Sequence, residues 1–239
     1  MDKIDQIFAQ LDDWRHLPAY QLERRADIFF SLYLPKILKA GTGRDINDIV
    51  IPEFPLHKKT LKKSWTNQPF RADYFALSKD GKVAFLVELK TDRGSSSDNQ
   101  DGYLEMARDA GLPALLNGIL KIVKADKRNF DYLCKYFYLL KKLEALGLAS
   151  QLDALEDNLK SGSRDGFDAA LEAVRLATSA SKVFLICIQP DRADKKERYD
   201  ETISFHTARK VVIRHRDPVS KRFAEALKAW EIPAQDCLD

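Results

Sequence analysis

The stretch of sequence that most constrains the fold is RADYFALSKDGKVAFLVELKTD, Arg71 to Asp92, because it reads as one β-hairpin with charged residues at its open end. The Asp80-Gly81 dipeptide is a strong hairpin signal and favours a two-residue type I′ turn. Val83 to Val87 is purely apolar, as expected for a strand buried within a mixed sheet. That run leads directly into Glu88 and Lys90. Either the strand simply ends there, or its end is a site.

The turn determines which residues face one another across this hairpin. With a two-residue turn, Asp73 lies opposite Glu88 and Arg71 lies opposite Lys90. Because side chains alternate between faces along a strand, we expect Asp73, Glu88 and Lys90 on one face at one end. Opposed carboxylates repel, so a positive group should lie between them, supplied by Lys90, Arg71 or a divalent cation. A three-residue loop with a bulge would instead place Asp73 opposite Val87 and break the pair.

The rest of the sequence predicts an α/β domain with a mixed sheet flanked by helices. Residues 19–39 have apolar side chains at helical spacing, with Pro35 as a kink or boundary. Residues 49–59 read as a strand that Pro52 and Pro55 restrict to a sheet edge. The other predicted helices are residues 93–126 after a Ser- and Asp-rich cap, residues 129–147 ending at Gly147, residues 165–180 and residues 218–231, and the further strands are residues 182–190 and much of residues 201–215.

Composition limits the class of protein. A net charge of +3 and a pI of about 8.6 tolerate a polyanionic partner without requiring one. The three cysteines are widely separated and form no Cys-x-x-Cys pair, which argues against a disulfide framework or a zinc cluster. The first residues lack an apolar signal core and no segment approaches the length of a membrane span. The sequence therefore predicts a cytoplasmic protein without membrane contact.

The charged end of the hairpin also carries a family resemblance. Asp73, fourteen intervening residues, then Glu88-Leu89-Lys90 resembles the motif of the PD-(D/E)XK nuclease superfamily, the restriction endonuclease-like fold. The likeness covers roughly Leu22 to Arg108, with residues 182–190 matching a further core strand. The proline that names the motif is Ala72 here, which does not affect the chemistry. The resemblance implies one nuclease-like domain over residues 1–239, with a core at about 19–190, a helical insertion at about 112–180 and additional C-terminal helices.

The resemblance also implies roles for the motif residues. In that family the first carboxylate and the glutamate bind Mg²⁺ or Mn²⁺, often with the backbone carbonyl between, which here gives Asp73, Glu88 and Leu89. Lys90 would position or activate the attacking water and steady the developing charge. Such a site hydrolyses a phosphodiester with a metal-activated water, so no nucleophilic side chain is needed.

Two further residues match the family by their order in the chain. Glu23 corresponds to an acidic residue on the first helix that often completes the metal shell, with Asp27 or Glu53 as substitutes. Gln100 corresponds to a glutamine on the helix after the motif, with Tyr103 one turn on at a spacing one residue shorter than in the best-known branch.

The function predicted from the sequence is therefore a Mg²⁺-dependent nuclease that acts on DNA rather than RNA. The alternative is a catalytically silent member of the fold that binds nucleic acid or protein. Many members of that family dimerise to cut both strands, so the resemblance leaves open whether this protein forms a homodimer. A lysine run just before the hairpin is predicted either to bind phosphates or to form a solvated surface, and its members are Lys58, Lys59, Lys62 and Lys63.

Overall fold

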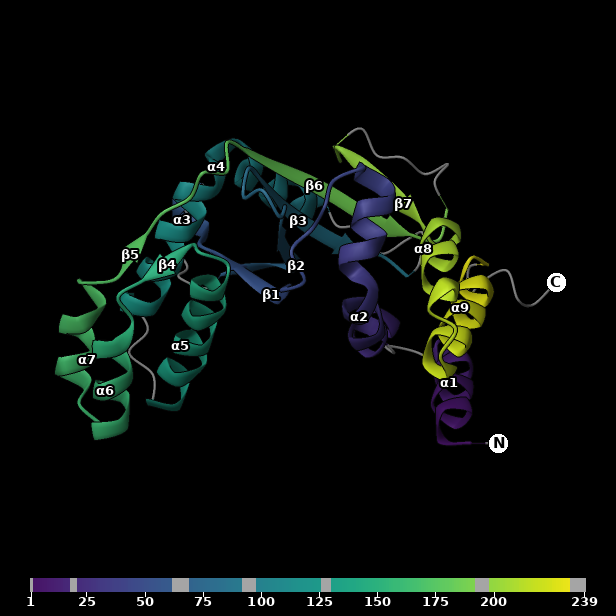
Figure 1. Cartoon of the computed structure of the whole chain (residues 1–239), viewed down its shortest axis with the longest axis horizontal. Helices are drawn as coiled ribbons and strands as arrows, with labels where there is room; N and C mark the ends of the chain where they lie inside the picture. Colours follow the sequence, from purple (N-terminus) through teal and green to yellow (C-terminus); the bar gives the residue numbers. More distant parts are fainter. Residues whose placement is uncertain are drawn as a thin grey trace.

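The computed structural model describes residues 2–17, 21–61, 69–91, 98–125, 130–191 and 198–232, without the side chains of residues 98–101, 130 and 131. Its centre is a five-stranded mixed sheet in the order β1-β2-β3-β6-β7 (Figure 1). The strands are β1 (Ile51–Leu56), β2 (Phe70–Leu77), β3 (Val83–Leu89), β6 (Lys182–Gln189) and β7 (Glu201–Ser204), and a separate ribbon pairs β4 (Ala149–Ser150) with β5 (Arg175–Leu176). The predicted fold class, a mixed sheet flanked by helices, is confirmed.

The sheet combines two kinds of pairing. β1, β2 and β3 are antiparallel neighbours, whereas β6 runs parallel to β3 and β7 runs parallel to β6. β1 is an edge strand, as its two prolines predicted, because a proline has no N–H to donate to a second neighbour. β3 is central and all seven of its residues are buried, which explains the apolar run in its sequence.

Helices cover both faces of the sheet and extend beyond it at each end (Figure 1). One face packs on α4, and the other packs on α2 and the C-terminal helices. The helices are α1 (Lys3–Trp14), α2 (Leu22–Thr42), α3 (Lys58–Leu61), α4 (Asp98–Ala125), α5 (Phe130–Ala145), α6 (Asp153–Ser161), α7 (Arg164–Leu171), α8 (Phe205–Val212) and α9 (Pro218–Trp230), with a 3₁₀ turn at Ile213–His215. Among these described helices, none is both long and apolar enough to cross a bilayer.

The β2–β3 hairpin has the predicted register but a different turn. Leu77 pairs with Ala84 and Phe75 with Leu86, as the two-residue turn required. However, the Gly81 amide donates to the Ser78 carbonyl at 2.9 Å, and Gly81 alone in this turn has a positive φ, +70°. A type I′ turn needs positive φ at both central residues. Asp80 does not adopt it, because its carboxylate accepts from the Ser78 hydroxyl and the Lys82 amide.

Some predicted element boundaries are wrong. Pro35 lies inside α2 without ending it, because buried residues on both sides, such as Leu34 and Ile37, hold the helix against the sheet. The predicted strand at residues 201–215 is mostly the helix α8. Ser204 caps this helix by accepting from the Thr207 amide at 3.3 Å. The predicted helix at residues 165–180 ends at Leu171.

Candidate active site

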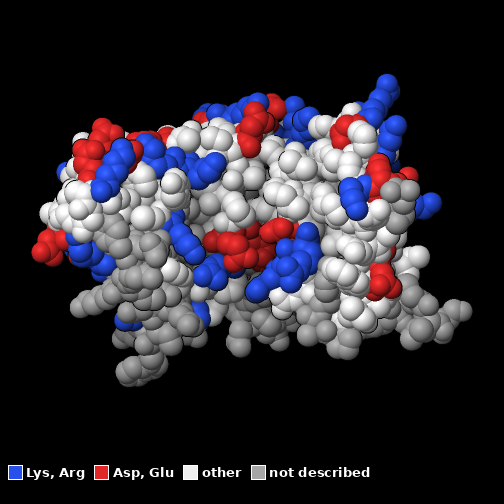
Figure 2. Space-filling view, turned by 90° about the horizontal axis from the view of Figure 1, so that it is seen from below, with Lys and Arg blue, Asp and Glu red and all other residues white. Residues whose placement is uncertain are grey.

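A pocket of about 320 Å³ opens at the charged end of the hairpin. Its lining combines acidic and basic side chains from α2, β1, α3, β2 and β3. Figure 2 shows acidic side chains at the bottom of a central hollow with basic side chains beside them. The residues that line this acidic pocket are Gln21, Glu23, Arg24, Glu53, Lys58, Pro69, Phe70, Arg71, Asp73, Glu88, Leu89 and Lys90.

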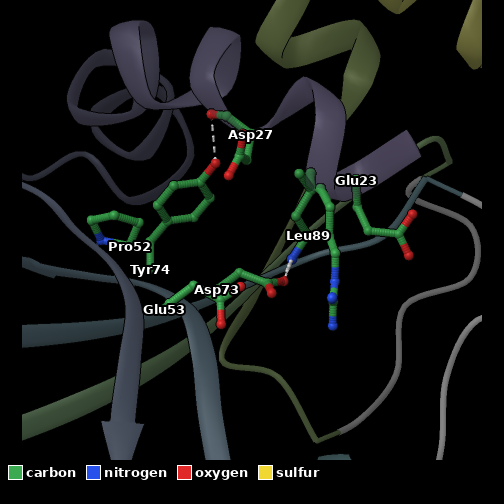
Figure 3. A pocket seen from close by; sticks show the side chains of 8 residues that line it. Glu23, Asp27, Pro52, Glu53, Asp73, Tyr74 and Leu89 are labelled. Atoms are coloured by element: carbon green, nitrogen blue, oxygen red, sulfur yellow. Dashed lines mark hydrogen bonds between the residues drawn. The ribbon is translucent and has the colours of Figure 1, made fainter. Parts of the chain in front are cut away.

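Asp73 enters the pocket where the regular strand pairing breaks. Ala72 and Phe75 pack in the same core cluster although they are three residues apart, so the alternation of side chains is interrupted between them. On β1 the matching position is Glu53, whose φ of +50° marks the same irregularity. Asp73 Oδ2 accepts from the Leu89 amide at 2.7 Å (Figure 3). The carboxylate thus takes the place of a backbone acceptor.

The predicted pair at the open end lies just beyond the regular ladder. In the described hairpin the backbone pairing runs as far as Tyr74 and Val87, and Asp73 and Glu88 are the next residues along the two strands. The two carboxylates line the same pocket. Arg71 does not lie between them, because its guanidinium approaches Glu53, with Nε 3.8 Å from Oε2.

Glu88 and Lys90 form a buried ion pair at the end of β3. Lys90 Nζ lies 2.6 Å from Glu88 Oε1, and the two residues are 8% and 1% exposed. The Lys90 amide also donates to the Ile188 carbonyl of β6 at 2.8 Å, which fixes the backbone beside the pair. Burying two charges costs free energy that their mutual attraction only partly returns. Apolar side chains could often fill such a position at lower cost, so the buried pair makes this strand end a candidate site.

Glu23 reaches the pocket from the first turn of α2. Its Oε2 accepts from the Thr91 hydroxyl at 3.0 Å, just past the end of β3. A carboxylate is favoured there, because the N-terminal end of a helix carries partial positive charge. The substitutes suggested by sequence lie close by. Glu53 lines the acidic pocket, and Asp27 lines a side pocket of about 20 Å³ together with Glu23, Glu53 and Asp73 (Figure 3).

Burial changes the pKa of Asp73 within this cluster. Loss of solvent is the largest cause that raises the pKa of Asp73 to about 6, and the charges of Glu53 and Glu23 contribute to the rise. The Leu89 amide and the Lys90 ammonium oppose this rise. The same burial, with Asp27, Asp73 and Glu53 nearby, raises the pKa of the Tyr74 hydroxyl. That hydroxyl donates to the Asp27 carbonyl at 2.7 Å.

The other predicted site residues divide into three groups. Lys58 lines the acidic pocket, whereas Lys59 is exposed on α3 and does not line it. Lys62 and Lys63 lie outside the described residues, and the side chain of Gln100 lies outside the described side chains. The sequence predictions for these last three therefore stay predictions.

The pocket also contains residues that sequence reasoning did not select. Arg24 follows Glu23 on α2, and Phe70 begins β2. Thr91 holds Glu23 and directly follows the Glu88-Leu89-Lys90 motif, which was the one sequence signal for it. Arg24 and Phe70 carry no signal in isolation, because charged helix faces and aromatic strand residues are common.

The donor set of the pocket suits a hard divalent cation. Carboxylates and a backbone carbonyl are the oxygen ligands that Mg²⁺ prefers, and Mg²⁺ is usually bound through one or two carboxylates plus water and substrate phosphate. The acidic pocket, which both Asp73 and Glu88 line, is large enough for such an ion and its waters. Among the described residues, no three acidic, histidine or cysteine side chains are already grouped closely enough to hold an ion. Asp73 and Glu88 are the two carboxylates that would hold it, with water and phosphate as the remaining ligands.

Comparisons with protein-family models, with curated proteins and with solved structures found no match to this chain.

Proposed function

We propose that this protein is a Mg²⁺-dependent nuclease of the PD-(D/E)XK type that hydrolyses phosphodiester bonds in DNA. The supporting observation is the convergence of charged side chains in one pocket, where the half-buried Asp73 lies with the buried Glu88 and Lys90 at the end of β3. Loss of solvent also raises the pKa of Asp73 to about 6. Perturbed groups of this kind concentrate at functional sites.

Each residue has a distinct part in the proposed chemistry. A bound Mg²⁺ supplies an activated water and neutralises charge on the phosphate. Asp73 and Glu88 are the carboxylates that would hold it, with the Leu89 carbonyl available between them and Glu23 at the pocket wall. The Lys90 ammonium lies beside Glu88 and can donate to a phosphate oxygen or to the attacking water.

Cleavage assays with conservative variants test this proposal. The wild type should cut DNA oligonucleotides in Mg²⁺ or Mn²⁺ and should not cut them in a chelator. Asp73→Asn and Glu88→Gln keep the shape of each side chain and should each abolish cleavage. Asp80→Asn is the matched control, because Asp80 is an exposed aspartate at the other end of the same hairpin. It should retain wild-type activity.

A broad panel of DNA and RNA substrates gives the opposing outcome. If the protein binds these substrates but cuts none with either metal, and the Asp73 and Glu88 variants bind equally well, the enzyme must be rejected in favour of a binding module. Binding that weakens as salt rises would then point to phosphate contacts alone.

A further inference from the structure

An aromatic shelf lies beside the acidic pocket and contributes two of its lining residues. We use this name for Phe70, Tyr103 and Lys58. The Phe70 and Tyr103 rings stack with centroids 5.6 Å apart and an interplanar angle of 15°. Lys58 Nζ lies 5.5 Å from the centroid of the Tyr103 ring. Phe70 and Lys58 also line the pocket, so the shelf is continuous with the proposed catalytic groups.

The shelf differs from the aromatic packing of the core. Phe54 and Phe75 also stack, with centroids 4.5 Å apart, but both rings are fully buried. Phe70 and Tyr103 are only partly buried. A pair that served packing alone would gain more by burying all of its apolar surface.

The distance from the shelf to the carboxylates suits a polynucleotide. Phe70 precedes Asp73 by three residues on β2, which corresponds to about 10 Å along a strand at ~3.3 Å per residue. About three stacked nucleotides cover that distance at a rise of ~3.4 Å each. Arg71 is exposed beside Phe70 and lines the pocket with Lys58, so two cations flank the ring where a phosphate backbone would pass.

We propose that the aromatic shelf stacks an unpaired base about three nucleotides from the scissile phosphate, so that the substrate is a single-stranded polynucleotide or a single-stranded end. In the interior of a duplex both faces of each base are covered by neighbouring bases, whereas an unpaired base can turn a face to a protein ring at any position of a single strand. The Lys58 ammonium holds the Tyr103 ring by a cation–π contact. This inference rests on the proposed nuclease function and defines its substrate class.

Binding measurements without cleavage test the shelf directly. The probes are a fluorescein-labelled twelve-nucleotide single-stranded DNA, the matched RNA and the blunt DNA duplex, each in a chelator. Phe70→Leu keeps an apolar side chain and removes the ring, so it should weaken single-strand binding about tenfold, because stacking on an aromatic ring is worth ~1–3 kcal/mol per base. Duplex binding should be unchanged. Tyr138→Leu is the matched control, since Tyr138 is a 69% exposed aromatic residue of α5 outside the pocket.

A spectroscopic readout separates stacking from a structural role. A single strand that carries 2-aminopurine should lose fluorescence on binding the wild type and should keep it with Phe70→Leu. If Phe70→Leu does not fold, Phe70→Trp decides the matter, because its indole emission should be quenched by the single strand. Equal single-strand affinity in wild type and Phe70→Leu, absent quenching, or absent binding of any single strand would each overturn the shelf. The RNA probe reports whether the shelf distinguishes the two sugars.

Cleavage in Mg²⁺ distinguishes the two proposals. If the enzyme cuts but Phe70→Leu leaves the ratio of single-strand to duplex kcat/KM unchanged, the shelf fails and the nuclease stands. If nothing is cut but Phe70→Leu still weakens single-strand binding selectively, the shelf stands and the nuclease fails.

Discussion

The two ends of the β2–β3 hairpin each carry an aspartate, and their environments have opposite effects. At the turn, Asp80 is exposed, and hydrogen bonds from Ser78 and the Lys82 amide lower the pKa of its carboxyl. At the open end, burial raises the pKa of Asp73 to about 6. The charged form of Asp80 therefore stabilises the folded state, whereas ionising Asp73 in the folded state costs free energy.

This difference separates structural from chemical use of the same residue type. The turn end satisfies every local preference, since a glycine takes the positive φ and the carboxylate bonds to neighbouring backbone. The open end violates them, because strand alternation breaks at Asp73 and an ion pair is buried beside it. Local violations of this kind are expected at functional sites. The following predictions test that contrast, beginning with the largest expected effect.

Removal of the Lys90 charge should produce the largest change. Lys90→Met keeps most of the side-chain volume but removes the donor, and we expect cleavage to slow by about a hundredfold or more. Calorimetric titration should show that Mg²⁺ binding is largely retained, because Lys90 is not a ligand. Lys82→Met, at the turn end, is the control and should cut at the wild-type rate. Equal rates for the two variants would contradict the proposed role of Lys90.

Neutralising Asp73 should stabilise the protein in a pH-dependent way. The folded-state pKa of about 6 lies above the ordinary value of 3.8, so the folded state binds this proton more tightly than the unfolded state. The free-energy cost of ionising Asp73 in the folded state therefore grows as pH rises from about 4 to about 6, and it is fully present above that range. Asp73→Asn should raise the free energy of unfolding by about 1–3 kcal/mol at pH 8. Urea denaturation at pH 4 should show no such gain.

Asp80→Asn should change stability in the opposite direction. Its carboxyl pKa is lowered in the folded state, so the charge stabilises the fold above the unfolded-state pKa and this benefit disappears in acid. The variant should therefore be slightly less stable than wild type at neutral pH. A gain in stability for Asp80→Asn at pH 8 would remove the contrast between the two ends.

Mg²⁺ should stabilise the wild type and not the Asp73 variant. A ligand present at about ten times its Kd adds ~1.4 kcal/mol, which raises Tm by about 3–6 °C in a domain of this size. Differential scanning fluorimetry with and without Mg²⁺ measures this shift. Asp73→Asn should show little shift, whereas Asp80→Asn should respond like the wild type. A shift of equal size in all three proteins would place the cation elsewhere.

Gly81→Ala should have the smallest effect on cleavage, because its change should be confined to stability. Gly81 has a φ of +70°, and an added Cβ would lie 3.1 Å from Ser179 Oγ. The substitution should cost about 1–2 kcal/mol, measured by urea denaturation. Cleavage by the folded fraction should be unchanged, and a loss of activity beyond the loss of folded protein would show that the turn contributes to the site.

Local sequence signals predicted the hairpin well because its register depends on short-range features. The predicted register is confirmed from Leu77–Ala84 to Tyr74–Val87, although the predicted turn type is wrong. A slip of one residue would turn the apolar side chains of one strand to the opposite face of the sheet, so the apolar pattern fixes the register. The β-branched residues of 201–215 predict strand, which is correct for β7 (Glu201–Ser204) and wrong for α8 (Phe205–Val212), whose buried face packs against the sheet.

The site was less predictable than the hairpin, because its geometry depends on contacts between distant segments. Sequence order alone suggested Glu23, whose position depends on how α2 packs across the sheet. The break at Asp73 depends on the matching irregularity at Glu53 on the neighbouring strand. Periodicity along one strand carries no information about such a defect, and no sequence pattern marked Phe70 as a pocket residue.

The parallel contact between β3 and β6 has a consequence for synthesis of the chain. β1, β2 and β3 are close in sequence and can pair early, but residues 90–181 separate β3 from β6. The Lys90 amide can donate its hydrogen bond to the Ile188 carbonyl only after β6 has paired with β3. Contacts across such long intervals form late, because closing a long loop costs entropy before the contact repays it. A growing chain on the ribosome would therefore hold a finished hairpin with an unfinished charged end until β6 has emerged.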